Sequence, residues 1–250
     1  MPVDFTTEQV MEIIRESFGG SPMPYLTDPA ARRRAAAIAA AQGLPERIAA
    51  DLEDGRDIPI VPYTRFRDYQ RNGNRTRCER YQRGRAGQIE LAAMACLLGI
   101  EKLDYLHDLM WAECESTWWV MAAHERHGTP IDLRAAMTAC KLATVLTALG
   151  GRIDPEVRRR VTEEIGRRVL GPNLDPAHRH WWKTCTNNWN AVCIANVAIA
   201  AMLLERDRDR HSHQPLPRRA GALGDVPVGR RRRSGRRQRR GPAAVRRPAA

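Results

Sequence analysis

The sequence predicts an all-α protein made of stacked helical hairpins. Apolar residues recur at helical spacing in successive segments, as Val10, Ile13, Ile14 and Phe18 do near the start of the chain. Short polar joins separate these segments, and no stretch of any length alternates apolar and polar residues as a β-strand does. Helices joined by short connections pack as antiparallel neighbours. The pattern by itself therefore indicates paired antiparallel helices.

Each expected helix begins or ends at a residue whose chemistry favours that boundary. Thr6 or Thr7 caps a helix within residues 1–20, and Asp132 caps another that Gly150 ends. Pro155 opens the next helix, since proline fits the first helical turn. The expected helices after residue 20 lie at 29–42, 44–54, 63–85, 88–98, 102–125, 132–149, 154–169 and 191–204.

The chain shows no export signal, membrane span or metal motif. Residues 1–20 lack the apolar core of a signal peptide, and no apolar run approaches the roughly 18–20 residues that a membrane span requires. The 6 cysteines include no C-x-x-C pair and are expected to be free buried thiols, which suits a reducing cytoplasm. The sequence His-Glu-Arg-His at 124–127 is one residue short of the zinc motif H-E-x-x-H. We therefore expect a cytoplasmic protein with no membrane partner, no metal and no cofactor.

The stretch at 178–204 places polar amides at the start of an apolar helix. Asparagine is a poor residue for a helix interior, because its side chain competes for backbone hydrogen bonds. One alternative is an N-cap, a turn residue and a buried hydrogen bonder; the other is a set of amide donors that face an anionic or sugar ligand. The residues of this motif and the tryptophans before it are Trp181, Trp182, Asn187, Asn188, Trp189 and Asn190.

Arginine and tyrosine are concentrated at 63–85, which includes Arg67 and Tyr81. A solvated helical face is one interpretation, because arginine stems can cover apolar neighbours. A platform for sugar acids is the other, with guanidinium groups on carboxylate or sulfate and tyrosine rings on sugar faces. Trp118 and Trp119 are adjacent on an expected helix and cannot both face one direction, so one of them is a candidate for lining a groove.

Four segments resemble the helical domain of heparinase II/III-like proteins, a group of polysaccharide lyases and relatives. They share the order and spacing of that family, and the resemblance covers roughly residues 20–204. The segments are YTRFRDYQRNGNRTRCERYQRGR at 63–85, LMWAECESTWWVMAAHE at 109–125, IDLRAAMTACKLATVLTAL at 131–149 and the Asn-Asn-Trp-Asn motif at 187–190.

The resemblance implies an incomplete (α/α) toroid at 21–205 and β-elimination from uronate units of an acidic polysaccharide or oligosaccharide. Such a reaction requires donors that neutralise the ring carboxylate and a base that removes the neighbouring proton. On this basis Asn188, Asn187 and His124 are assigned to catalysis. The expected substrate-binding residues are Asn190, Trp189, Trp182, Trp181, Trp119, Arg67 and Tyr81.

The family's later tyrosine base and β-sandwich have no counterpart in this sequence. The last tyrosine is Tyr105, and the histidines after the motif are His211 and His213. We therefore expect the substrate-binding half of a lyase-like protein, truncated before its base, with little or no turnover.

The chain's charge is concentrated in residues 206–250. This tail holds 15 of the 41 basic residues and 3 of the 29 acidic ones, so 26 of each remain in the body and cancel. It contains no Ile, Met, Phe, Tyr or Trp and is expected to be disordered. Its Arg, Pro, Gly and Ala content also resembles GC-rich coding sequence translated in a wrong frame, so a frameshift near codon 205 is one hypothesis for its origin.

Two alternative functions differ in class from the lyase. The tail can bind nucleic acid non-specifically through its charge, although it carries no recognition motif. The helical body can instead be a non-catalytic scaffold for a carbohydrate or a protein. The neutral body favours the acidic-polysaccharide interpretation over nucleic-acid binding.

Deletion of residues 206–250 is expected to leave the helical circular dichroism signal per molecule nearly unchanged and to abolish most retention on DNA at low salt. The reason is that the tail holds the whole basic excess and little apolar surface. Loss of the helical signal on deletion would show instead that the tail belongs to the fold.

Overall fold

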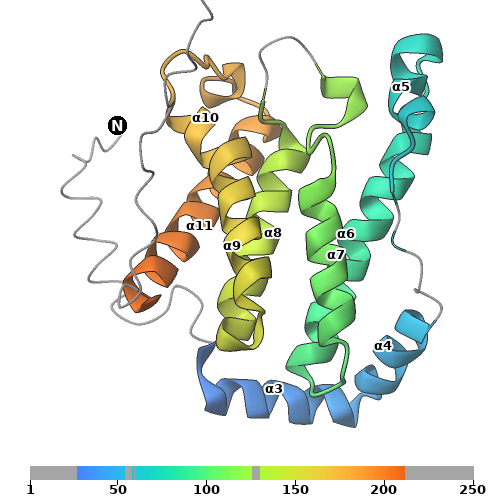
Figure 1. The fold of residues 1–250 in the computed structure, drawn as a ribbon, viewed down its shortest axis with the longest axis vertical. Coiled ribbons are helices and arrows are strands. Elements are labelled where there is room, and N and C mark those ends of the chain that lie inside the picture. The colour runs from blue at the N-terminus through green and yellow to red at the C-terminus, as the bar shows by residue number, and fades with distance from the viewer. Residues whose placement is uncertain (1–26, 54–57, 59, 126–129, 212–250) are drawn as a thin grey trace, which may run out of the picture. The chain divides into compact units, whose positions relative to one another are not determined.

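The computed structural model describes residues 27–53, 58, 60–125 and 130–211, and this part of the chain is mostly helical and contains no β-strand (Figure 1). The all-α prediction is therefore confirmed. The helix expected at 1–20 and residues 212–250 of the expected tail lie outside the described residues. The α-helices are α3 Pro29–Ala41, α4 Leu44–Glu53, α5 Tyr63–Asn72, α6 Thr76–Leu97, α7 Leu103–Glu115, α8 Leu133–Leu149, α9 Pro155–Ile165, α10 Gly171–Leu174 and α11 Asn188–His211. Short 3-10 helices lie at η1 Ala122–His124, η2 Gly150–Arg152 and η4 Trp181–Lys183, and a π-helix η3 Gly166–Leu170 joins α9 to α10.

The longer helices form two layers that run in opposite directions. Helices α6, α8 and α11 pack in one layer, and α7 and α9 pack in the other. Figure 1 shows α6, α8 and α11 running one way and α7 and α9 the other, with α3 across one end of the layers. Each α6–α7 and α8–α9 pair is thus an antiparallel hairpin, as the short joins predict.

Helix α8 is the centre of the core because it contacts helices of both layers. It packs against α6, α9 and α11, which leaves almost no polar face. Leu142 and Leu146 are fully buried. The segment 133–152 is also long and apolar enough to span a membrane by length and composition, but 61% of its most apolar window is buried among its neighbours. Its apolar composition is explained by this central position.

One expected helix boundary and one that the sequence did not predict fall where local chemistry places them. Asp132 caps α8, with its Oδ1 accepting a hydrogen bond from the backbone N–H of Ala135 at 2.8 Å. Between α5 and α6, Gly73 adopts φ 75°, a left-handed angle that ends α5 and splits the helical region expected at 63–85.

Other boundaries differ from the sequence prediction as well. Helix α6 continues through residues 86 and 87, where the expected helices at 63–85 and 88–98 are separate, and α11 begins at Asn188 rather than at 191. The helix expected at 102–125 ends at Glu115, because the chain folds back and Trp119 donates its indole Nε1–H to the carbonyl of Glu113 at 2.9 Å. At the other end of the chain, α11 continues past Leu204 to His211, so it enters the range that the sequence assigns to the tail.

A buried ion cluster joins α6, α7 and α8. The guanidinium of Arg85 lies 2.5 Å from Glu113 Oε2, and Arg134 Nη2 lies 2.8 Å from Glu113 Oε1. Glu113 is 1% exposed and Arg85 2% exposed. Burial acts to raise the pKa of Glu113, but the two arginines hold it below its ordinary value. The carboxylate is thus charged in the core and bonded by two helices other than its own.

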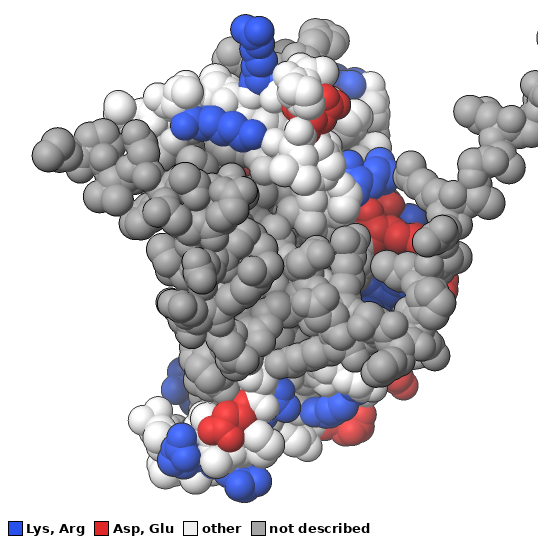
Figure 2. Space-filling model, turned by 90° about the vertical axis from the view of Figure 1, so that its left-hand side faces the viewer, with Lys and Arg blue, Asp and Glu red and all other residues white. Residues whose placement is uncertain are grey.

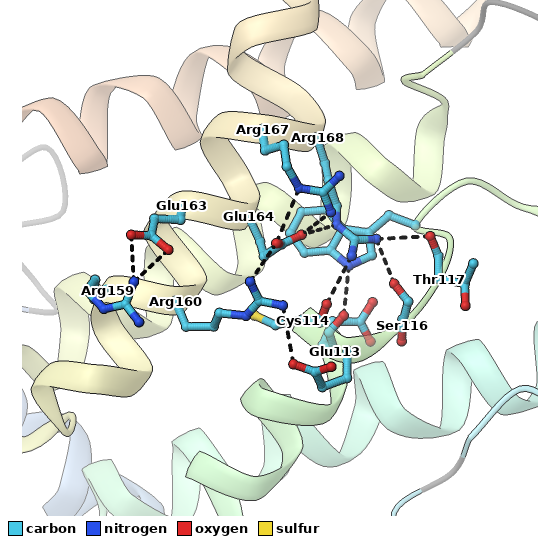
Figure 3. Close-up of polar contacts among 12 residues, drawn as sticks. Glu113, Cys114, Ser116, Thr117, Arg159, Arg160, Glu163, Glu164, Arg167 and Arg168 are labelled. Carbon is cyan, nitrogen blue, oxygen red and sulfur yellow. Dashed lines mark hydrogen bonds and ion pairs between the residues drawn. The ribbon is translucent and has the colours of Figure 1, made fainter. Parts of the chain in front are cut away.

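A second carboxylate, Glu164, connects the C-terminal end of α9 to the loop after α7 through arginine side chains (Figure 3). Glu164 accepts bonds from Arg160 at 3.0 Å, from Arg167 at 2.6 Å and from Arg168. Arg168 continues to the carbonyls of Cys114 and Ser116 at 3.0 and 2.7 Å. The irregular segment after α7 is therefore held by hydrogen bonds rather than by helical structure.

The described surface mixes the two signs of charge. On the face in Figure 2, basic and acidic side chains are interspersed at both ends of the molecule. This distribution agrees with the neutral body that the sequence composition gives.

Substitution of Glu113 by Gln is expected to destabilise the fold by about 3–5 kcal/mol, because it leaves buried arginines without their counter-charge. Since the folded pKa of Glu113 is lowered, its contribution is present above the unfolded value near 4.5 and is lost as the pH falls through the folded value. Urea unfolding at pH 7 measures the loss. Glu163→Gln is the control, since Glu163 is an exposed partner of Arg159 worth at most about 1 kcal/mol. Equal effects of both substitutions would contradict a structural role for the buried cluster.

Candidate ligand-binding site

The predicted motif residues lie at the end of the two layers opposite α3. The C-terminal end of α7, the N-terminal end of α8 and the N-terminal end of α11 are all at this end (Figure 1). Trp182 connects two of them, because its indole Nε1–H donates to the carbonyl of Ile131 at 3.1 Å. The tertiary structure therefore brings residues 131–132 close to residues 181–190, which are distant from them in sequence.

The three asparagines of the motif have three different roles. Asn187 caps α11, with its Oδ1 accepting from the backbone N–H of Trp189 at 3.0 Å. Asn190 donates from Nδ2 to the carbonyls of Trp182 and Lys183 at 3.0 and 2.9 Å, which fixes the turn before the helix. Asn188 is exposed and bonds to no other residue that the structure describes. The structural alternative thus accounts for two asparagines and leaves the Asn188 amide free for a ligand.

His124 is held in a defined orientation by a buried carboxylate. Its Nδ1 lies 2.8 Å from Oδ2 of Asp132, and the same oxygen accepts from the backbone N–H of Met121 at 3.0 Å. Asp132 is 0% exposed, whereas the His124 side chain is 18% exposed. Because Nδ1 faces an acceptor, it carries the proton in this bond, and Nε2 is left as the acceptor of the ring.

An aromatic row extends from His124 to the surface. The rings of His124 and Trp189 meet edge to face with centroids 4.7 Å apart, and those of Trp189 and Trp181 lie 5.0 Å apart. Trp181 is 50% exposed and Trp189 is half-buried. Exposed indole faces next to a free amide are suited to stacking on sugar rings.

The other predicted residues divide by position. Arg67 lies on α5, and its Nη1 bonds at 3.0 Å to Glu125, the residue after His124. Tyr81 is half-buried on α6 and has no hydrogen bond within the described part of the chain.

Two predicted binding residues are core residues. Trp119 is 2% exposed and Trp182 is 0% exposed, and each indole N–H bonds to a backbone carbonyl. The prediction that they contact substrate does not fit this burial. Trp118, the neighbour of Trp119, is 47% exposed and stacks on Phe66 with ring centroids 6.1 Å apart. Adjacent tryptophans do face different directions, as expected, but the exposed one is Trp118.

The cysteines that the structure describes are free thiols. Within the described residues, no group of three or more His, Cys, Asp or Glu side chains could hold a metal ion. Burial raises the pKa of Cys114 and of Cys193 to about 12, so these thiols remain protonated.

The arrangement can bind an anion and transfer a proton. Asn188 offers an amide donor, His124 offers an oriented imidazole, and Trp181 and Trp189 offer apolar faces. Sequence analysis missed Asp132, which it recognised only as a helix cap. The signal was an acidic cap a few residues after a histidine, but only the fold brings Oδ2 to Nδ1.

Comparison with known proteins adds no assignment. No protein-family model matches the chain, and no curated protein matches it.

Substitution of Asn187 by Ala is expected to lower the free energy of unfolding by about 1 kcal/mol, the usual cost of losing an N-cap. Asn188→Ala is expected to change it by less than about 0.5 kcal/mol, because that side chain is exposed and makes no bond to a described residue. Urea unfolding of the two variants measures the difference. A larger loss of unfolding free energy in Asn188→Ala than in Asn187→Ala would show that Asn188, and not Asn187, has the structural role.

Proposed function

We propose that the chain binds acidic, uronate-containing oligosaccharides at the end of α11 and belongs to the class of β-eliminating polysaccharide lyases. The observation that carries the proposal is the exposed, unpaired Asn188 amide beside Trp189, whose ring contacts the imidazole that Asp132 orients. The four segments that resemble heparinase II/III-like proteins include each of these residues.

The side chains present divide the work of such a reaction. The Asn188 amide donates to the ring carboxylate and reduces its negative charge, which makes the neighbouring proton easier to remove. The indole rings of Trp181 and Trp189 hold sugar faces, and Arg67 lies within the same end of the molecule for a second acidic group. Since the family's later tyrosine has no counterpart in this sequence, we propose Nε2 of His124 as the proton acceptor for whatever turnover the chain retains. In that step the C–H bond breaks and the proton moves to Nε2, a double bond forms in the ring and the glycosidic oxygen leaves with the electron pair.

We also propose that the two layers are part of an (α/α) toroid. Parallel helices within each layer and antiparallel helices between layers support this arrangement. In such a fold the loops at one end of the layers line the substrate cleft, and the candidate residues share one end.

The test is calorimetric titration of the full chain with oligosaccharides of heparan sulfate, hyaluronan and alginate. Asn188→Ala is expected to weaken binding by about 1–3 kcal/mol, the usual cost of removing a hydrogen bond to a charged group. Gln42→Ala is the matched control, because Gln42 is an exposed amide at the end of α3, away from the site. Equal affinity of all three proteins would remove Asn188 from the site.

The reaction is followed in the same samples by the ultraviolet absorbance of the unsaturated product. His124→Ala is expected to lower any elimination by about 10²–10⁴-fold, the usual contribution of a positioned proton acceptor. Binding without an absorbance change in the unsubstituted chain would contradict the lyase step and leave a carbohydrate-binding function.

A further inference from the structure

A groove of about 660 Å³ runs between α11 and the continuous helical segment α9–η3–α10. Its lining is mainly apolar and includes Trp182 and Lys183 of the turn before α11, so one end of the groove adjoins the candidate ligand-binding site. Leu174 and Ile194, two large apolar residues in its lining, are 79% and 43% exposed. At Gly166 a Cβ atom would meet no described atom within 4 Å, so the space beside this residue is open.

Each wall of the groove is a stripe at helical spacing. Thr162, Gly166 and Leu170 lie four residues apart on α9–η3. On α11, the facing stripe is Ile194, Ala198 and Ala201. Two such stripes on neighbouring helices form the kind of groove that accepts the apolar face of a third helix.

The layer arrangement also leaves the groove side of α11 uncovered by any helix that the structure describes. Helix α6 is covered by α7 and helix α8 by α9, but within the described residues no second-layer helix covers α11 beside α9. The groove lies at that position, so a helix placed there would extend the layer of α7 and α9.

We propose that residues 4–18 of this chain occupy the groove as an amphipathic helix. Val10, Ile13, Ile14 and Phe18 recur at i, i+3, i+4 and i+8, the spacing of a helix that binds in a groove. The same segment is acidic, with Asp4, Glu8, Glu12 and Glu16 against Arg15 alone. The groove lining includes Lys183 and no acidic residue, so its charge is complementary.

The length of the connection permits this contact. Arg32, in the first turn of α3, donates a hydrogen bond from Nη2 to the carbonyl of Ala148, at the end of α8 where the chain turns into α9. The first turn of α3, which follows residues 1–26, therefore lies near the start of α9. Thr162 is seven residues along α9 from Pro155, or about 10 Å at 1.5 Å per residue. The eight residues 19–26 span up to about 26–29 Å when extended, which is sufficient.

Amide hydrogen exchange on the full chain tests the proposal. We expect the amides of residues 8–18 to exchange at least about tenfold more slowly than those of an unstructured peptide, because helical and buried amides open rarely. Ile14→Glu places a charge on the apolar face and is expected to abolish this protection. Arg15→Glu is the matched control, since it introduces the same residue one position along, on the polar face, and is expected to retain protection.

A second pair of variants tests the groove itself. Ala198→Glu introduces a charge at an exposed groove position and is expected to release residues 8–18 while leaving the exchange of α8 unchanged. Ala35→Glu, at an exposed position of α3, is expected to change neither. Unprotected residues 8–18 in the unsubstituted chain would overturn the proposal, as would equal behaviour of Ile14→Glu and Arg15→Glu. Protection that appears only as the chain dimerises, measured by light scattering across a concentration series, would assign the groove to a second copy instead.

Discussion

The buried carboxylate of Glu113 is the interaction on which the arrangement of the helices depends. It lies on α7 and bonds to Arg85 of α6 and Arg134 of α8, so one charged group fixes the relative positions of three helices. Arginine is suited to this role because its planar guanidinium holds several acceptors at once. Arg134 also donates to the carbonyl of Trp119 at 2.8 Å, which extends the cluster into the irregular segment after α7.

That segment links the core to the candidate site. Arg168 bonds to the carbonyls of Cys114 and Ser116, and its guanidinium lies 5.0 Å from the ring centroid of Trp119. Between Trp119 and His124, the backbone N–H of Met121 bonds to Asp132, and the carbonyl of Ala122 accepts a bond from Gln70 at 3.0 Å. A binding group benefits from such support, since its orientation is set before a ligand arrives.

The asparagine motif places structural residues next to the residue that we propose binds a ligand. Asn187 and Asn190 satisfy backbone groups at the start of α11, and their bonds hold the turn from which Asn188 projects. Asp132 combines roles in the same way, because one oxygen caps α8 and the other orients His124. At each of these helix starts, some polar atoms bond to the backbone and others belong to the candidate site.

The helical class, many helix boundaries and the segments that carry the candidate site can be predicted from the sequence alone. These features depend on local chemistry. Asp132 caps α8 and Pro155 begins α9, and neither role requires a contact with a distant part of the chain. Tertiary structure decided which residues of each segment are available to a ligand. Periodicity could not tell Trp118 from Trp119, because their burial depends on the fold-back that ends α7 at Glu115. Periodicity also could not predict that Asp132 bonds to His124, or that Asn188 bonds to no other described residue. Both outcomes depend on contacts between segments that only packing brings together.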